Sequence, residues 1–108
     1  MMLVFEKDDG ILIAFPSAGG AESWCELIDV QNGEDEFCDG EGQRYGYAVT
    51  KPMGLFLSGG FTLVPEGAPD GQNVMRLIDK ARSFEGNRCG IGSIDELKAQ
   101  VLKRKGGA

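Results

Sequence analysis

The sequence predicts an α+β domain in which an antiparallel sheet of about five to six strands carries three packed helices. Three observations lead to this fold class. Short β-branched and aromatic runs are separated by glycine-containing turns, other segments carry apolar stripes at helical spacing, and the 42% hydrophobic and 26% charged composition is that of a globular protein. A chain of 108 residues is close to the commonest domain size, so we expect a single domain over residues 1–108.

The first sixteen residues predict a β-hairpin. Apolar runs at residues 3–5 and 11–15 flank Asp9-Gly10, and this dipeptide is a strong hairpin signal because the turn requires positive φ. The second run is apolar at consecutive positions, which predicts a central strand covered on both faces. Pro16 then ends the strand.

The next segment predicts an amphipathic helix. Ala21, Trp24, Cys25 and Ile28 fall at i, i+3, i+4 and i+7, so they form one apolar stripe. We expect Trp24 to be an anchor in the core and Cys25 to be a buried structural thiol. Gly33 marks the turn after this helix.

Residues 34–50 predict a second hairpin with its turn at residues 39–42. The apolar runs 55–57 and 61–64 predict either two paired strands or one strand bent at a glycine bulge.

Two further helices are expected in the C-terminal third. Asp70 begins the first, and Ser93 with Glu96 forms a capping box at the start of the second. The stripe of the first is Val74, Leu77, Ile78, Ala81 and Phe84, and the buried face of the second is Leu97, Val101 and Leu102.

Charge is distributed unevenly along the chain. Residues 1–43 hold eleven acidic residues against one base, Lys7, a net charge of −10, whereas the whole chain has a net charge of −6. Such a field repels nucleic acid and anionic membranes and attracts a basic partner. We therefore expect neither nucleic acid nor a membrane surface as a partner.

The residue types present argue against several kinds of chemistry. The chain has no histidine, which removes the commonest general base and metal ligand. The glycine run 40–46 resembles a phosphate loop, but Tyr45 stands where the third glycine belongs. The same region lacks the bidentate glutamate of a calcium loop, since Gly46 occupies that position. We expect no enzyme activity, no metal and no cofactor.

The cysteines and the hydropathy predict a cytoplasmic protein. Three cysteines without a CxxC pair argue against a disulfide framework, and no apolar run is long enough to span a bilayer. Reactivity of Cys89 stays an open question, because the neighbouring Arg88 would lower the pKa of its thiol.

One segment resembles a known group of proteins. Residues 21–34 end in Ile-Asp-Val-Gln-Asn-Gly-Glu and are followed by Asp39-Gly40. This pattern is similar to small acidic bacterial proteins in which a helix runs into such a turn and an acidic hairpin. Some of those proteins resemble immunity proteins of contact-delivered toxins.

The charge distribution and this resemblance lead to one functional hypothesis, a non-enzymatic immunity or inhibitor protein that masks a basic partner such as a toxin effector domain. Its acidic side chains would steer association, and aromatic anchors would add affinity. The expected partner-binding residues are Glu22, Glu26, Asp29, Glu34, Asp35, Glu36, Asp39 and Glu41, with Phe37 and Tyr45 as anchors.

Two alternatives belong to other classes. A phage or mobile-element protein that mimics nucleic acid would use the same charges, in a regular row that imitates phosphates. A homodimeric enzyme or ligand-binding domain would use residues 55–64 as a sheet edge or dimer face, and it predicts a concave pocket with convergent polar groups.

Overall fold

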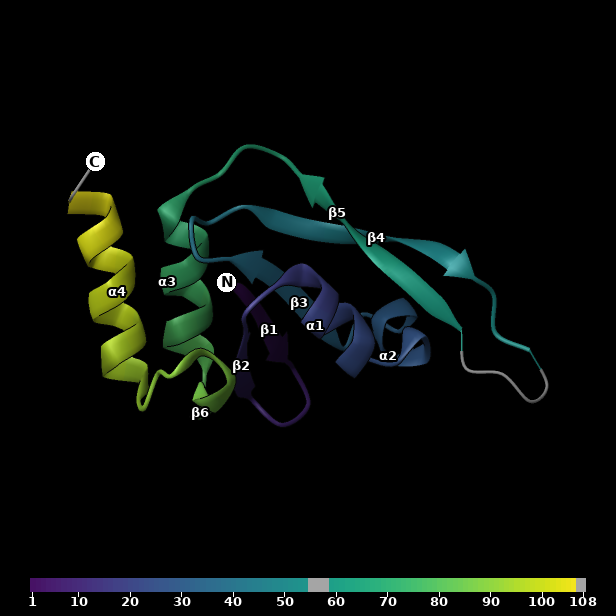
Figure 1. The fold of residues 1–108 in the computed structure, drawn as a ribbon, viewed down its shortest axis with the longest axis horizontal. Coiled ribbons are helices and arrows are strands. Elements are labelled where there is room, and N and C mark those ends of the chain that lie inside the picture. The colour runs from purple at the N-terminus through teal and green to yellow at the C-terminus, as the bar shows by residue number, and fades with distance from the viewer. Residues whose placement is uncertain (55–58, 107–108) are drawn as a thin grey trace.

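A computed structural model describes residues 1–54 and 59–106, and it confirms the α+β class (Figure 1). Within these residues a sheet has the strand order β5-β4-β3-β1-β2-β6. The strands are β1 (Met2–Glu6), β2 (Ile11–Phe15), β3 (Asp35–Asp39), β4 (Arg44–Lys51), β5 (Gly60–Glu66) and β6 (Ser83–Glu85). The helices are α1 (Ala18–Trp24), α2 (Leu27–Gln31), α3 (Gly71–Lys80) and α4 (Ile94–Gly106), with the 3₁₀ turn η1 (Asn87–Cys89). None of the described helices is both long and apolar enough for a membrane crossing.

Both predicted hairpins form, and only the outermost pair departs from an antiparallel sheet. β6 runs parallel to β2, with Leu12 opposite Phe84, and α3 carries the chain from β5 at one edge of the sheet to β6 at the other. The sequence assigned Phe84 to a helical stripe, but α3 ends at Lys80. The amide of Arg82 then donates to the carbonyl of Gly10 at 2.7 Å and starts the short edge strand.

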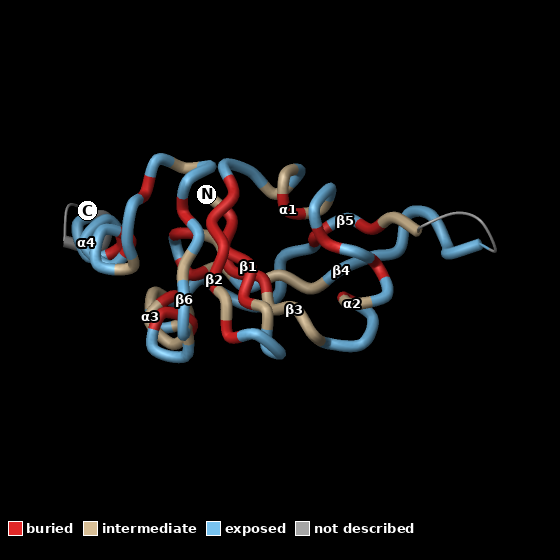
Figure 2. Tube along the Cα trace, turned by 90° about the horizontal axis from the view of Figure 1, so that it is seen from below, coloured by how far each residue is buried: buried red, intermediate tan, exposed pale blue. Residues whose placement is uncertain are grey.

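Helices cover both faces of the sheet. Val4 belongs to a core cluster that includes residues of α1 and α2, and Leu3 belongs to a second cluster that includes residues of α3 and α4. We call these sides the α1/α2 face and the α3/α4 face. β1 and β2 are buried between them, which confirms the prediction of a central strand over residues 11–15 (Figure 2).

The predicted single helix after Pro16 is two short helices. The backbone is extended at Cys25 and Glu26, with ψ of 143° and 137°, so the helical stripe is interrupted. α2 is therefore turned to bury Leu27 and Val30. Trp24 and Ile28 remain 41% and 49% exposed, and the prediction of Trp24 as a core anchor is wrong.

The C-terminal helix begins at the predicted capping box. Ser93 Oγ accepts from the Glu96 amide at 3.2 Å, and the Glu96 carboxylate accepts from the Gly92 amide at 2.7 Å. Leu97 and Val101 are buried as expected, but Leu102 is exposed because it projects from the outer side of the helix. The apolar run 55–57 lies outside the described residues.

The turn between β3 and β4 packs against the start of α3 and requires glycine at position 42. Gly42 has a φ of 89°, and a Cβ atom there would collide with the backbone carbonyl of Asp70. The Gly42 carbonyl also accepts from the Asp70 amide and from the Asn73 side chain. This approach fixes one end of the sheet against the α3/α4 layer.

We predict that Gly42→Ala lowers the free energy of unfolding much more than Gly67→Ala. Both glycines have positive φ, but a Cβ at Gly67 meets nothing within 4 Å. Gly67→Ala should cost only the left-handed backbone penalty of about 1–2 kcal/mol, and Gly42→Ala should cost at least ~3 kcal/mol. Urea denaturation measures both, and equal losses would contradict the close contact with Asp70.

Candidate functional site

Six carboxylates from three segments surround a hollow of about 110 Å³ at one end of the sheet. We call it the acidic hollow. One group comes from the end of β1 and the turn to β2, another from α2, and a third from the start of β3. The six are Glu6, Asp8, Asp9, Asp29, Glu34 and Asp35.

Backbone hydrogen bonds hold these segments together. Glu6 and Asp35 are register partners in the antiparallel pair β1–β3, so their side chains share the α1/α2 face. The Lys7 amide donates to the Glu34 carbonyl at 2.9 Å, and the Glu34 amide donates to the Asp29 carbonyl at 3.0 Å. The carboxylates are therefore placed by the main chain and by the core beneath them, against their mutual repulsion.

Three of the six carboxylates have raised pKa values. Burial, followed by the charges of Glu6, Asp29 and Asp8, raises the pKa of Asp35 to about 6. Burial and the charge of Asp9 raise the pKa of Glu6. Contact with the Asp29 carboxylate is the largest cause that raises the pKa of Glu34. A positive charge in the hollow would reverse the repulsive contributions.

The nearby cations lie on the other side of the sheet. Lys7, the one base in residues 1–43, has its Nζ 4.0 Å from Glu36 Oε1 on the α3/α4 face. Arg76 and Lys80 of α3 approach the same carboxylate at 3.1 and 3.9 Å. Among the described residues, no lysine or arginine forms an ion pair with a carboxylate of the acidic hollow. The sheet thus separates a neutralised acid from six uncompensated ones.

The structure brings together only three of the ten residues expected to bind a partner, namely Asp29, Glu34 and Asp35. Glu36 lies on the opposite face, where it is paired as described above. Glu22 on α1 accepts from the Leu63 amide at 2.6 Å and from the Thr62 hydroxyl at 3.0 Å. Glu22 therefore covers the backbone at the free edge of β5, which is a structural role.

The remaining expected residues lie elsewhere. Glu26 is exposed at the start of α2, and Asp39 lies at the other end of β3, about 13 Å along the strand from Asp35. Asp39 accepts from the amides of Glu41 and Gln43, which fixes the β3–β4 turn. The ten residues do not form one surface.

The two aromatic residues expected to be anchors also make contacts within the fold. Phe37 is only 5% exposed and packs near Phe61, with ring centroids 6.1 Å apart, so it is a core residue and cannot serve as a surface anchor. Tyr45 is half-buried, and its hydroxyl donates to Asp39 at 3.2 Å. An apolar contact for a partner must come from another residue.

Sequence reasoning missed Glu6, Asp8 and Asp9. The local signal was present, because three acids surround the first hairpin turn. Their proximity to Asp35 depends on the pairing of β1 with β3, which no local pattern specifies.

The metal-ligating residue types and the three cysteines are placed as follows. No three histidine, cysteine or acidic side chains among residues 1–54 and 59–106 are arranged to hold a metal ion. Burial raises the pKa of Cys25 and of Cys38 to about 12 and also raises the pKa of Cys89. Arg88 therefore does not activate Cys89, because its guanidinium lies over the ring of Phe15 instead. This arrangement corrects the expectation that Arg88 lowers the thiol pKa.

Comparison of the chain with protein-family models, with curated proteins and with solved structures finds no match. The acidic hollow must therefore be interpreted from its own geometry.

We predict that Asp35→Asn stabilises the fold at pH 7 by about 1 kcal/mol, after allowance for solvent at a half-exposed group. The folded wild type keeps a proton that the unfolded chain releases between about pH 4 and pH 6, so its free energy of unfolding falls as the pH rises through this window. The gain should disappear below pH 4. Urea denaturation across pH measures it, with Glu41→Gln at an exposed turn as the control, and a gain independent of pH would contradict the assignment.

Proposed function

We propose that the chain is a non-enzymatic binding protein that masks a cationic surface of a basic protein partner. An immunity or inhibitor protein acting on a toxin effector domain in the cytoplasm is the most concrete form of this role. The observation that supports it is the acidic hollow, which gathers six carboxylates without an ion-pair partner among the described residues.

Electrostatic repulsion within the hollow favours a cationic ligand. A lysine or arginine side chain that enters would replace repulsion between carboxylates by attraction, and it would lower the raised pKa values of Glu6, Glu34 and Asp35. Binding therefore releases protons near pH 6, where Asp35 is partly protonated. The affinity should rise with pH through that region, because the charged form of the hollow is the one that binds.

Charge provides rapid association more readily than tight binding, so an apolar contact is also needed. Ile28 is 49% exposed and directly precedes Asp29 in α2. It can supply the contact that the buried Phe37 cannot. A partner with a projecting lysine or arginine beside an apolar surface would match both the hollow and Ile28.

The distribution of the charges favours masking of a compact cationic site over imitation of nucleic acid. Mimicry predicts a row of regularly spaced carboxylates, whereas the six carboxylates surround one hollow of about 110 Å³. A hollow of that size suits one or two inserted side chains.

A pair of triple variants tests this role. The hollow variant carries Asp8→Asn, Asp29→Asn and Glu34→Gln, and the control variant carries Glu41→Gln, Glu66→Gln and Asp79→Asn. Each removes three negative charges from the formal −6, so net charge is matched and only position differs. We predict that the wild type and the control capture the same basic protein from native cell lysate, in a complex that dissociates in high salt.

The hollow variant should bind that protein about 100-fold more weakly, since three lost contacts at roughly 1 kcal/mol each amount to two powers of ten. Isothermal titration calorimetry with the purified partner measures the ratio. The wild type should also inhibit the activity of the partner, and the hollow variant should not at equal concentration. Equal binding by the two triple variants, or binding insensitive to salt, would overturn the proposal.

A further inference from the structure

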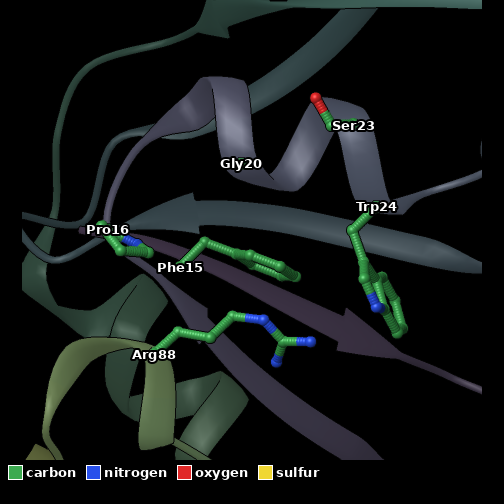
Figure 3. Close-up of a pocket in the computed structure, with 6 residues that line it drawn as sticks. All are labelled: Phe15, Pro16, Gly20, Ser23, Trp24 and Arg88. Carbon is green, nitrogen blue, oxygen red and sulfur yellow. The ribbon is translucent and has the colours of Figure 1, made fainter.

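A second and larger hollow lies at the opposite end of β2 from the acidic hollow. Its volume is about 390 Å³, and the end of β2, helix α1 and the turn η1 supply its walls (Figure 3). The lining residues are Phe15, Pro16, Gly20, Ser23, Trp24 and Arg88.

Two aromatic rings and a guanidinium group define the interior. The centroids of Phe15 and Trp24 are 5.7 Å apart with their planes inclined by 51°, and the guanidinium carbon of Arg88 lies 5.0 Å from the centre of the Phe15 ring. In Figure 3 the Arg88 side chain extends along Phe15 toward the indole of Trp24. Phe15 is only 2% exposed beneath these two groups, so the hollow presents the indole of Trp24 and the guanidinium of Arg88 to a ligand.

The donors of Arg88 remain available to a ligand. Arg88 forms an ion pair with Glu85 at 3.8 Å, and a ligand would share the guanidinium with this carboxylate, because both side chains are about half exposed. This distance is beyond hydrogen-bond range, and no hydrogen bond links the guanidinium to another described residue. A planar guanidinium with free N–H groups matches a carboxylate in a bidentate arrangement.

Gly20 keeps the space open on the helix side. A Cβ atom at this position would lie 3.6 Å from Phe15 Cδ1, which is an ordinary contact, so alanine can be accommodated while the hollow becomes smaller. The neighbouring Gly19 is not part of the lining, and a Cβ there would meet only Ser17 Oγ, at 3.7 Å. The two glycines thus offer a matched pair of substitutions in one helix.

We propose that this hollow is a binding site for a small planar aromatic carboxylate. The ring of the ligand stacks on the exposed indole of Trp24, and its carboxylate pairs with Arg88. The volume falls within the range of small-molecule sites, and a mostly apolar lining with a few polar groups is typical of them. The site is separate from the acidic hollow and does not depend on the masking role.

Three probes separate the parts of the proposed ligand. 2-Naphthoate has the ring and the charge, 2-naphthamide has the ring without the charge, and acetate has the carboxylate without the ring. Trp24 is the single tryptophan of the chain, so its indole N–H resonance in ¹H–¹⁵N spectra reports on this hollow alone.

We predict saturable binding of 2-naphthoate with a dissociation constant of about 1 mM or below, the affinity expected of a ligand of this size. 2-Naphthamide should bind at least ~10-fold more weakly, and acetate should leave the Trp24 signal unchanged. Equal affinity for the amide and the carboxylate would overturn the role of Arg88. Absence of a shift with 2-naphthoate would overturn the site.

Substitutions complete the test. Gly20→Ala should weaken 2-naphthoate binding at least ~10-fold, and Gly19→Ala should leave it unchanged, although both replace a helical glycine by alanine. Arg88→Gln should reduce the preference for the carboxylate over the amide to less than about 2-fold. Thermal unfolding of each variant verifies its fold, and unchanged affinity in a folded Gly20→Ala variant would contradict the proposed location.

Discussion

The alternation of side chains along β1 determines how charge is distributed over the molecule. β1 lies between β2 and β3 with both faces covered, so each step along it sends a side chain to the opposite core. Glu6 thereby reaches the α1/α2 face, and Lys7 turns to Glu36 on the other face. A slip of one residue would exchange the side chains of β1 between the two cores and would send Glu6 to the α3/α4 face. The separation of uncompensated acids from the nearby cations follows from the alternation of side chains along this strand and its continuation.

The acidic hollow is maintained against its own electrostatics by that same core. Val4 and Ile13 are almost fully buried on the same face of the sheet, and main-chain hydrogen bonds from Lys7 and Glu34 connect the segments around the hollow. Repulsion at a half-exposed surface is weak enough for such a framework to tolerate, as the raised pKa of Asp35 illustrates. Amide side chains at these positions would stabilise the fold at least as well as the carboxylates do. Because the carboxylates repel one another without stabilising the fold, a ligand-binding role explains them better than a structural role.

Local signals in the sequence specify the two hairpins and the capping box, because turn chemistry and caps act over a few residues. The interruption of the first helix was not predictable in this way, since the stripe from Ala21 to Ile28 fits one continuous helix. The parallel pairing of Phe84 and the meeting of Glu6 with Asp35 depend on strand order, which is a non-local property. The candidate site was therefore only partly predictable. Asp29, Glu34 and Asp35 are close in the chain, whereas their partners Asp8 and Asp9 belong to another hairpin.

The extended backbone at Cys25 and Glu26 connects the two hollows. In one unbroken helix Trp24 and Ile28 would lie one turn apart on the same buried stripe, and neither would reach the surface. The break allows Cys25, Leu27 and Val30 to fill the core instead, which leaves Trp24 beside Arg88 at one hollow and Ile28 beside Asp29 near the other. The break in the helix thus exposes two large apolar side chains. Trp24 lies next to the positive Arg88, whereas Ile28 lies next to the negative Asp29. Exposed apolar area at both places lowers the stability of the fold, and a ligand that covers it would be stabilised by the burial. The opposite charges would direct the proposed cationic partner to one hollow and the proposed aromatic anion to the other.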